Sequence, residues 1–582
     1  MEKFQLDDSI HSVIITDCGS TTTKARLFEK SGSTWKFSQR GESPTTVEAP
    51  IEDVTYGVKN SIKELEEVTK KTFLLDENLS WAPGVLFLST SSAGGGLQIL
   101  CAGGVKNYTC GSAERAALGA GAILLDALSF DDVREDPELI QSIRELKPDM
   151  ILLVGGIDGG AKHFALKLAE ILRAAAPKPR FGASLKLPVI FAGNKDVYPQ
   201  VKEILKEVAD IFFASNVRPE ILTESIHEAR EVIHELFLTH VMSHSPGYEK
   251  LIKATPEPIL PTPSAVGDMV QVYATNTKKN LLCVDIGGAT TDIFSCIFDS
   301  ENVLNFHRSV SANFGMSYSI GNVLVKAGVR NIKRWLNFDI SDSDLKDILR
   351  NKMIRPTTIP QTREDLFIEQ AVSREALRLS LEHHKTIALS ASSSLKKEKL
   401  LSNLFSQDAG RNSLINMKNI DVVIGSGGVL SHAPTRLSAA MMIIDGFALE
   451  GITEILIDSV FLLPHLGVFS TVNEHAALEI LQNDCLIPIG SSIVPTSRKN
   501  VETFGDIFIH DKKVATIHSG EVLHVPEQGK KTIKCIPHNS TVDFGDGAGK
   551  IVEREVLMGV CGLIIDGRNR PFAGNSVFVE LS

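Results

Sequence analysis

The sequence of 582 residues lacks the features that mark membrane proteins, secreted proteins and proteins that bind nucleic acid. Its apolar runs stay short of the roughly 18 residues that a membrane span requires. The N-terminal segment MEKFQLDDSIHS lacks the basic and apolar succession of a secretory signal. Acidic residues outnumber basic ones, giving a net charge of −11, so there is no general attraction to nucleic acid. These absences predict a cytoplasmic protein without a nucleic-acid or membrane partner.

Cysteine is present, but without the spacing of a metal site or a disulfide framework. The eight cysteines are dispersed along the chain, and none forms a C-x-x-C pair. They are expected to be buried free thiols in a reducing compartment. The phosphate-binding motif G-x-x-x-x-G-K-[ST] is missing as well, since GAGK at 547–550 is followed by Ile551. A P-loop enzyme is therefore excluded.

The chain is long enough for several domains. At roughly 100 to 200 residues per domain, its length predicts three or four units. With 43% hydrophobic and 23% charged residues, the composition is typical of a globular protein. Changes of pattern divide the chain into the ranges 1–95, 96–254, 255–264, 265–500 and 501–582.

Two of these ranges contain the same local pattern. Residues 12–28 (SVIITDCGSTTTKARLF) and 281–298 (LLCVDIGGATTDIFSCIF) each read as an apolar strand ending at an aspartate, a polar turn with glycine, and a second strand. A spacing near 270 residues indicates a duplicated domain rather than a repeat array. We therefore expect 1–95 and 265–500 to be two α/β halves, joined by the proline-rich hinge 255–264.

The other two ranges have patterns of their own. Within 96–254, helical patterns alternate with short apolar runs, which predicts a parallel sheet with crossover helices, either completing the first half or inserted into it. The runs are 150–156, 188–193 and 210–215. After residue 500 the chain changes to short alternating runs with Gly and Asp, which predicts a small all-β domain in 501–582.

The first turn offers the groups that a nucleotide phosphate needs. Glycine lets the main chain approach a phosphate, hydroxyls donate hydrogen bonds, and a lysine supplies a point charge for the β and γ oxygens. Asp17, at the end of the strand, is a candidate catalytic carboxylate and a candidate Mg²⁺ group. The phosphate-binding candidates are Gly19, Ser20, Thr21, Thr22 and Lys24.

The second turn repeats this set of groups. Gly287 and Gly288 form the loop, and Thr290 and Thr291 add hydroxyls. Asp285 is the foremost candidate for holding the waters of a bound Mg²⁺, and it is also a candidate catalytic residue. Either loop alone could be an ordinary tight turn. Two matched loops in duplicated halves make that alternative much weaker and predict a site for ATP and Mg²⁺.

Three further features carry weaker signals. Gly425, Gly427 and Gly428, in the run GSGG, could let an adenosine lie against bare backbone, although packing of a strand against a helix explains the same run. Asp158, in GGIDGG, is a candidate water-activating or Mg²⁺ group, with the cap of a helix at 162–175 as an equal alternative. His465 is predicted to be a satisfied core or helix-end histidine rather than a catalytic group.

Taken in order, these motifs resemble the actin-like ATPase superfamily. More narrowly, the chain resembles the accessory ATPases of glutamate mutase, labelled GlmL or MutL and unrelated to the mismatch-repair protein of the same name. The resemblance runs almost from end to end. It includes DCGSTTTKARLF, STSSAGGGL, LLVGGIDGG, VDIGGATTDIFS, GSGGVLSHAP, FLLPHLGV and GVCGLIIDGRNRP.

The resemblance implies a fold, a cofactor and a partner. The fold would be two duplicated actin-like, ribonuclease-H-like halves, with an additional α/β region and a small C-terminal β domain. The cofactors would be ATP and Mg²⁺. The partner would be an adenosylcobalamin-dependent mutase, of the glutamate mutase or aminomutase type, which the protein reactivates by exchanging damaged cobalamin for intact coenzyme. A chaperone-like ATPase is thus the leading hypothesis.

One segment departs from the family, and two alternatives stay open. Relatives carry an acidic E-G-D-L-G-M-R type run after the second hairpin, whereas residues 311–317 read SANFGMS here. Two carboxylates and a basic group are therefore missing, so ATP hydrolysis could be slow. One alternative is a small-molecule kinase or ATP-coupled hydrolase on the same fold. The other is an ATP-gated scaffold with little hydrolysis.

Overall fold

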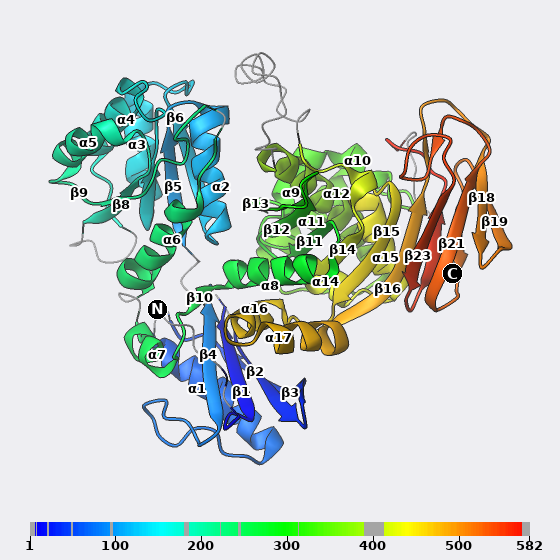
Figure 1. Cartoon of the computed structure of the whole chain (residues 1–582), viewed down its shortest axis with the longest axis horizontal. Helices are drawn as coiled ribbons and strands as arrows, with labels where there is room; N and C mark the ends of the chain where they lie inside the picture. The colour runs from blue at the N-terminus through cyan, green and yellow to red at the C-terminus, as the bar shows by residue number, and fades with distance from the viewer. Residues whose placement is uncertain are drawn as a thin grey trace. The chain divides into compact units, whose positions relative to one another are not determined.

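The structure, a computed structural model, describes most of the chain (Figure 1). The described residues are 6, 8–19, 22–47, 50–92, 97–179, 186–221, 223–242, 246–311, 313–388 and 413–572. They fold as two compact units. The described part of unit 1 comprises residues up to 272 together with 462–484, and that of unit 2 comprises 273–388, 413–461 and 485–572.

The first sheet of unit 1 contains the Asp17 hairpin. Its strand order is β10-β4-β1-β2-β3, in which β1, β2 and β3 are antiparallel neighbours, β4 is parallel to β1, and β10 is parallel to β4. The strands are β1 (Ser12–Cys18), β2 (Thr22–Ser31), β3 (Thr34–Pro44), β4 (Val85–Ser91) and β10 (Leu260–Pro261). The predicted hairpin at Asp17 is thereby confirmed.

Helices cover this sheet because their apolar residues recur at helical spacing. Helix α1 (Val54–Thr69) buries Val54, Val58, Ile62 and Leu65, and the Asp53 side chain caps its first turn. The other helices here are α7 (Tyr248–Ala254), α16 (Leu463–Val472) and α17 (Glu474–Ile480).

The last two of these helices correct one predicted boundary. We expected 265–500 to form one half, but 462–484 fold with unit 1. The physical reason is apolar packing, since the Phe469 ring of α16 lies 5.6 Å from the Phe28 ring and 5.5 Å from the Trp35 ring. At Gly467 the helix also approaches Ala265 so closely that an added Cβ would lie 1.8 Å from its carbonyl oxygen.

The second sheet of unit 1 is parallel throughout, as the sequence predicts. Its order is β6-β5-β7-β8-β9, which in chain order is 2-1-3-4-5, a doubly wound arrangement. The strands are β5 (Gln98–Gly103), β6 (Ile123–Ser129), β7 (Met150–Leu153), β8 (Leu187–Phe191) and β9 (Ala209–Phe213). This sheet is inserted between β4 and β10 of the first sheet.

Five helices flank this inserted sheet. Helices α3, α4 and α5 pack together and share a core of their own, whereas α2 and α6 contact each other and join the core of the first sheet. They are α2 (Gly111–Gly119), α3 (Asp136–Leu146), α4 (His163–Ala175), α5 (Tyr198–Leu205) and α6 (His227–Leu236).

Unit 2 is built on an eight-stranded sheet that repeats the first sheet of unit 1. The order is β13-β12-β11-β14-β15-β16-β24-β20, and β13, β12, β11 and β14 pair as β3, β2, β1 and β4 do in unit 1. The strands are β11 (Leu281–Ile286), β12 (Thr291–Phe298), β13 (Leu304–Ser311), β14 (Val422–Ser426), β15 (Gly451–Asp458), β16 (Leu486–Val494), β20 (Val522–Val525) and β24 (Gly562–Asp566). The predicted duplication is therefore present in the fold.

A long helix, α12 (Arg363–Ile387), begins at a capping box of Thr362 and Asp365 and packs on β12 and β13. Near its end His384 is fully buried and hydrogen-bonds Ser309 and Ser295 with its two ring nitrogens, at 2.8 and 2.9 Å. The other helices are α8 (Thr262–Thr277), which leads from unit 1 into unit 2, α9 (Ile320–Ala327), α10 (Val329–Lys333), α11 (Asp342–Ile354), α14 (Gly428–Ser431) and α15 (Arg436–Gly446).

The C-terminal tail is all β among its described residues, as predicted, but it is not wholly a separate domain. Strands β20 and β24 extend the large sheet, because the apolar run of β24 is fully buried there. The rest forms a four-stranded sheet, β19-β18-β21-β23, and a two-stranded one, β17-β22. These strands are β17 (Thr496–Ser497), β18 (Thr503–Ile509), β19 (Lys512–His518), β21 (Gly529–Pro537), β22 (Val542–Asp543) and β23 (Val552–Met558).

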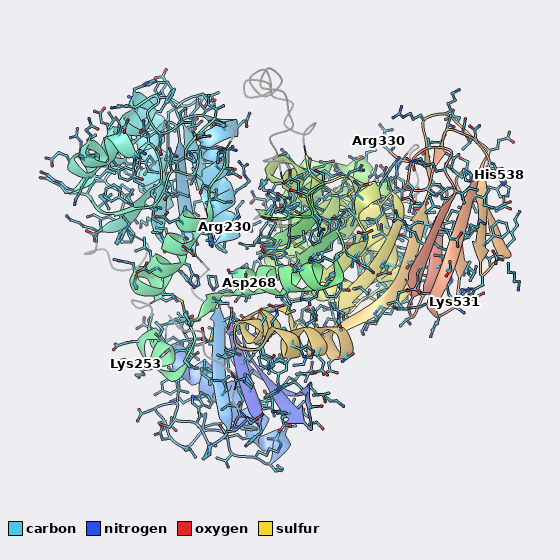
Figure 2. The ribbon with its side chains drawn as sticks, in the orientation of Figure 1. Arg230, Lys253, Asp268, Arg330, Lys531 and His538 are labelled. Carbon is cyan, nitrogen blue, oxygen red and sulfur yellow. The ribbon has the colours of Figure 1, made fainter. Side chains whose placement is uncertain are left out.

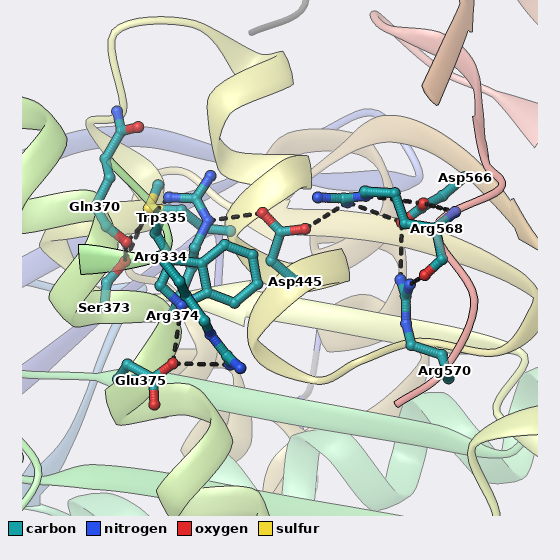
Figure 3. A network of polar contacts seen from close by, with 11 residues as sticks. Arg334, Trp335, Gln370, Ser373, Arg374, Glu375, Asp445, Asp566, Arg568 and Arg570 are labelled. Atoms are coloured by element: carbon teal, nitrogen blue, oxygen red, sulfur yellow. Dashed lines mark hydrogen bonds and ion pairs between the residues drawn. The ribbon is translucent and has the colours of Figure 1, made fainter. Parts of the chain in front are cut away.

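A buried network of charges ties the end of this tail to the helices of unit 2 (Figure 3). Asp445 on α15 accepts hydrogen bonds from Arg374 Nε of α12 at 2.7 Å and from Arg568 Nη2 of the tail at 2.6 Å. Arg568 and Arg570 also donate to Asp566, which is fully buried. Three segments that are distant in the sequence are thus held together by paired charges.

The described residues bear on the expectations about the cysteines and about membrane-spanning helices. All eight cysteines lie among them, buried and as free thiols. In the same part of the chain, no helix has both the length and the apolar character needed to cross a membrane.

Candidate functional site

The first candidate loop connects β1 and β2. Asp17 lies near the end of β1, 7% exposed, where its Oδ1 accepts a 2.7 Å hydrogen bond from the Thr262 hydroxyl. Burial raises the pKa of Asp17 above its ordinary value, while the Thr262 hydrogen bond and the charges of Lys24 and Arg26 oppose the rise. The carboxylate is therefore largely removed from solvent and stabilised by the first residue of α8.

The turn itself has the tight geometry that its glycine predicts. The Gly19 amide donates to the carbonyls of Asp17 and Thr22, both at 3.1 Å, and an added Cβ would lie 2.7 Å from the Thr22 carbonyl oxygen. Lys24 is paired directly opposite Asp17 in the antiparallel ladder, so their side chains share one face of the sheet. Ser20 and Thr21 lie outside the described residues.

The second candidate loop has the same design in unit 2. Asp285 is half-buried on β11, one residue before the strand ends. The Gly287 amide donates to the Thr290 carbonyl at 2.9 Å, which closes the turn as Gly19 and Thr22 do in the first loop. Gly288 is exposed at the tip.

One pair of charges beside this loop was missed by sequence reasoning. Asp292 on β12 is paired opposite Asp285, which places two carboxylates on one face of the sheet. The guanidinium of Arg308 on β13, which is buried, donates to Asp292 from Nε at 3.1 Å. Asp292 closes the motif DIGGATTD and was a visible signal, whereas Arg308 required knowledge of the strand register.

The segment that departs from the family folds directly onto this loop. Ser317 donates from its amide to the Gly288 carbonyl at 2.8 Å, and Met316 donates to the Gly287 carbonyl at 2.9 Å. The Thr291 hydroxyl donates to the Phe314 carbonyl at 2.6 Å, so it is already engaged within the protein. Thr290, at the turn, carries the freer hydroxyl, 3.5 Å from Asp292.

The GSGG run lies beside the same loop. Strand β14 is parallel to β11, with Ser426 opposite Asp285 in the register. Gly427 has a φ of 101°, and an added Cβ would lie 2.2 Å from the Ile286 carbonyl oxygen, so a side chain does not fit there. Gly425 is buried against aliphatic side chains of the core, whereas the Gly428 position is exposed and borders open space.

Asp158 belongs to the other sheet of unit 1, in the loop after β7. Its Oδ1 accepts hydrogen bonds from Asn216 Nδ2 at 3.0 Å and from the Lys195 amide at 3.2 Å. The alternative that it caps the following helix is wrong, because α4 has Lys162 as its N-cap and no side-chain cap bond. Asp158 instead holds together the loops that follow three neighbouring strands.

His465 is a core residue, as predicted. It is fully buried on α16, with Nε2 at 3.4 Å from the carbonyl oxygen of Lys24. This burial and the contact with the backbone of β2 place the ring in the core of unit 1.

A second missed residue lies on α8 (Figure 2). Asp268 is the only charged residue in the run from Thr262 to Thr277, which was the signal available in the sequence. It is half-buried, and burial raises its pKa to about 7.

Each carboxylate loop, taken by itself, fits a nucleotide that brings its own magnesium. Among the residues that the structure describes, no group of three or more His, Cys, Asp or Glu side chains could hold a metal ion by itself. Mg²⁺ in nucleotide sites is held by phosphate oxygens and waters with one or two carboxylates, and Asp17, or Asp285 with Asp292, provides that number.

The fold and the two loops define the class of the protein. The central sheets of the two units share a duplicated α/β architecture, with an aspartate one residue before the end of the first strand of each copy. A model of the MutL protein family matches residues 13–485, which include both loops. The chain belongs to this family.

A relative of known family agrees with this assignment. The chain is 30% identical over 439 residues to "Protein MutL" of Clostridium tetanomorphum, covering 72% of this chain and 86% of that protein. Two solved structures are similar at low identity. They are the activator of the 2-hydroxyisocaproyl-CoA dehydratase from Clostridium difficile with bound ADPNP (11% identity, 81% of this chain and 96% of that chain, TM-score 0.25) and a glycerol dehydratase reactivase (8%, 75% and 95%, TM-score 0.27).

Proposed function

We propose that this protein is an ATPase that reactivates an adenosylcobalamin-dependent mutase of the glutamate mutase or aminomutase type. Turnover of ATP would remodel the mutase, so that damaged cobalamin leaves and intact coenzyme enters. The observation that carries the proposal is membership of the MutL family over residues 13–485, a range that contains both carboxylate loops. The identity of the client rests on the resemblance of the sequence to the accessory ATPases of glutamate mutase.

The proposed roles follow from the geometry of each loop. Lys24, opposite Asp17, would meet the β and γ phosphates, and the Gly19 turn would let main-chain amides approach them. Asp285 would hold the waters of Mg²⁺, with Asp292 beside it bound by the guanidinium of Arg308. Bound ATP and Mg²⁺ would supply a reactive phosphoryl group and the cation that neutralises its charge.

A second candidate function is an ATP-gated scaffold with little hydrolysis. The observation in its favour is the segment that covers the Asp285 loop, which contacts it through Ser317 and main-chain groups rather than through a carboxylate. If a carboxylate at this place normally orients water or Mg²⁺, its replacement would slow the chemical step while leaving binding intact.

Reactivation of a damaged mutase tests the leading proposal. Adenosylcobalamin-dependent glutamate mutase, inactivated by turnover, is incubated with the protein, Mg²⁺ and free coenzyme, with ATP or with a non-hydrolysable analogue. Recovery of mutase activity only with ATP supports the proposal. Recovery with the analogue favours the scaffold, and no recovery in any condition contradicts both.

The metal role of Asp285 is tested by substitution. Asp285→Ala is expected to abolish Mg²⁺-dependent ATP turnover, because Asp285 is the proposed holder of the metal waters. The matched control is Asp210→Ala, which removes an exposed carboxylate on β9 and is expected to leave turnover unchanged. Phosphate release measured over a range of Mg²⁺ concentrations distinguishes the two, and wild-type turnover by Asp285→Ala would remove the metal assignment.

A further inference from the structure

One side chain holds the carboxylate of Asp17 in place. The Thr262 hydroxyl donates to Asp17 Oδ1 at 2.7 Å, and both residues belong to unit 1. Among the residues that the structure describes, Thr262 is the only hydrogen-bond donor to this carboxylate. A carboxylate accepts hydrogen bonds at both oxygens, so Oδ2 keeps its capacity for a ligand.

The Thr262 hydroxyl does not serve as the cap of its own helix. A threonine at the start of a helix commonly accepts a hydrogen bond from an amide of the first turn. The first turn of α8 is described in full, and none of its amides donates to this hydroxyl, whose neighbours are Asp17 Oδ1 and the Thr90 hydroxyl at 3.4 Å. The hydroxyl has a single proton, and the shorter contact indicates that Asp17 receives it. Thr262 is therefore directed at Asp17.

The backbone around Thr262 is fixed independently of this hydrogen bond. Just before it, β10 pairs with β4 of the first sheet. An added Cβ at Gly121 would lie 3.0 Å from the Cβ of Pro261. On the other side, an added Cβ at Gly467 would lie 1.8 Å from the Ala265 carbonyl oxygen. Because close packing holds the chain on both sides of Thr262, removal of the hydroxyl should leave the helix in place and release only the carboxylate.

The cations beside Asp17 have a different effect on it. Lys24 and Arg26 lie on the same face of β2, and each attracts the carboxylate through its charge. Arg26 is bound to Glu42 at 3.0 Å. A charge attracts a carboxylate without fixing its orientation, whereas a hydrogen bond to one oxygen restricts the plane of the group. Thr262 is therefore the residue that orients Asp17.

We propose that Thr262 is a positioning residue for the nucleotide site of unit 1. Its hydroxyl holds Asp17 Oδ1 and so keeps Oδ2 available to the waters of the magnesium that ATP brings. Residues that hydrogen-bond a metal-binding carboxylate commonly change the metal affinity by about 10- to 100-fold when they are replaced. This inference rests on the proposed function, since it requires ATP and Mg²⁺ at the Asp17 loop.

Binding of ADPNP, a non-hydrolysable ATP analogue, to the full-length protein tests this role without turnover and without a mutase. Affinities are measured by calorimetry in Mg²⁺ and in EDTA, and their ratio is the gain in affinity that magnesium supplies. Thr262→Val keeps the shape of the side chain and removes the hydroxyl. The magnesium gain is expected to fall by at least about tenfold, while the affinity in EDTA changes by less than about twofold. Thr262→Ser keeps the hydroxyl, so its gain is expected to stay within about threefold of the wild type.

Two further variants show whether Thr262 acts through Asp17. In Asp17→Ala the acceptor is missing, so adding Thr262→Val is expected to change the affinity for ADPNP in Mg²⁺ by less than about twofold, because both changes remove the same interaction. The matched control is Thr69→Val, which removes a hydroxyl that donates to the Leu65 carbonyl at 2.7 Å within α1. Its magnesium gain is expected to equal that of the wild type.

The outcomes separate this inference from the proposed function. A wild-type gain in Thr262→Val, or equal losses in Thr262→Val and Thr262→Ser, overturns the role of the hydroxyl and leaves the proposed function standing. An equal loss of affinity in Mg²⁺ and in EDTA shows that Thr262 supports only the shape of the site, which also overturns the inference. Additive effects of Asp17→Ala and Thr262→Val exclude action through Asp17. Failure of the wild type to bind ADPNP in either condition overturns both the inference and the proposed function.

Discussion

Removal of the Asp445 charge should destabilise unit 2 strongly. Asp445 is buried between Arg374 and Arg568, whose side chains are 6% and 7% exposed. In Asp445→Asn the shape is kept, but one acceptor oxygen is replaced by an amide group that faces a guanidinium. Each hydrogen bond between charged partners contributes about 1.5–3 kcal/mol, so weakening two of them costs about 3–5 kcal/mol, the range found when one partner of a buried ion pair is removed.

The assay can be confined to this unit. Trp335 is buried in the network, where its Nε1 donates to Glu375 at 2.8 Å. In a background carrying Trp35→Phe and Trp81→Phe, Trp335 is the remaining tryptophan, and its fluorescence during urea unfolding reports the unfolding of unit 2. The free energy of unfolding is expected to fall by about 4 kcal/mol in Asp445→Asn.

The control is an ion pair at the surface. Asp347 pairs with Arg350 on α11, and both side chains are more than 60% exposed. Asp347→Asn is expected to cost less than about 0.5 kcal/mol, because solvent screens the pair. A loss below about 1 kcal/mol for Asp445→Asn would refute the reasoning, since it would show that water or rearrangement compensates the two buried guanidinium groups.

Two further predictions concern single residues of unit 2. Burial holds the pKa of His384 well below its ordinary value. As the pH falls, the unfolded chain therefore takes up a proton on this histidine before the folded chain does. The stability that His384 contributes above about pH 6.5 is lost at up to about 1.4 kcal/mol per pH unit. Urea midpoints from pH 7.5 to 5.5 should show a shallower slope for His384→Gln than for the wild type, and equal slopes would contradict this. Gly427→Ala should destabilise unit 2 by about 2–4 kcal/mol, since its Cβ would meet the Ile286 carbonyl at a positive φ. Gly428→Ala, which borders open space, should cost less than about 1 kcal/mol in the same melt, and similar losses for the two would exclude this explanation.

The sequence predicted those features whose residues lie close together along the chain. The two hairpins were predictable because an apolar strand, a glycine turn and a second strand follow one another within eighteen residues. The parallel sheet of the inserted domain was predictable because its strands are short apolar runs separated by helical patterns. His465 was assigned to the core because its neighbours are apolar, and it packs there.

Features that depend on register or on long-range packing were not predictable in this way. Arg308 pairs with Asp292 across two strands, and the sequence does not state which residues face each other. The return of 462–484 to unit 1 depends on the fit of Phe469 against Phe28 and Trp35. For Asp158 the sequence left a site role and a helix cap as equal alternatives, and the partner Asn216, from a loop two strands away, was not predictable. The sequence alone identified the aspartates near the strand ends, but it did not identify the side chains that contact them in the fold.

The place where the inserted domain joins unit 1 has a mechanical consequence. The chain leaves the first sheet after β4 and returns as β10, where Leu260 is paired with Thr90 and accepts a hydrogen bond from its hydroxyl at 2.7 Å. Two residues later, Thr262 donates to the Asp17 carboxylate. Tension on the strand that leaves the inserted domain is thus carried to Asp17 through a path of two peptide units. Strain arising in the inserted domain can therefore reach Asp17 as the gain or loss of one hydrogen bond, the one that Thr262 donates.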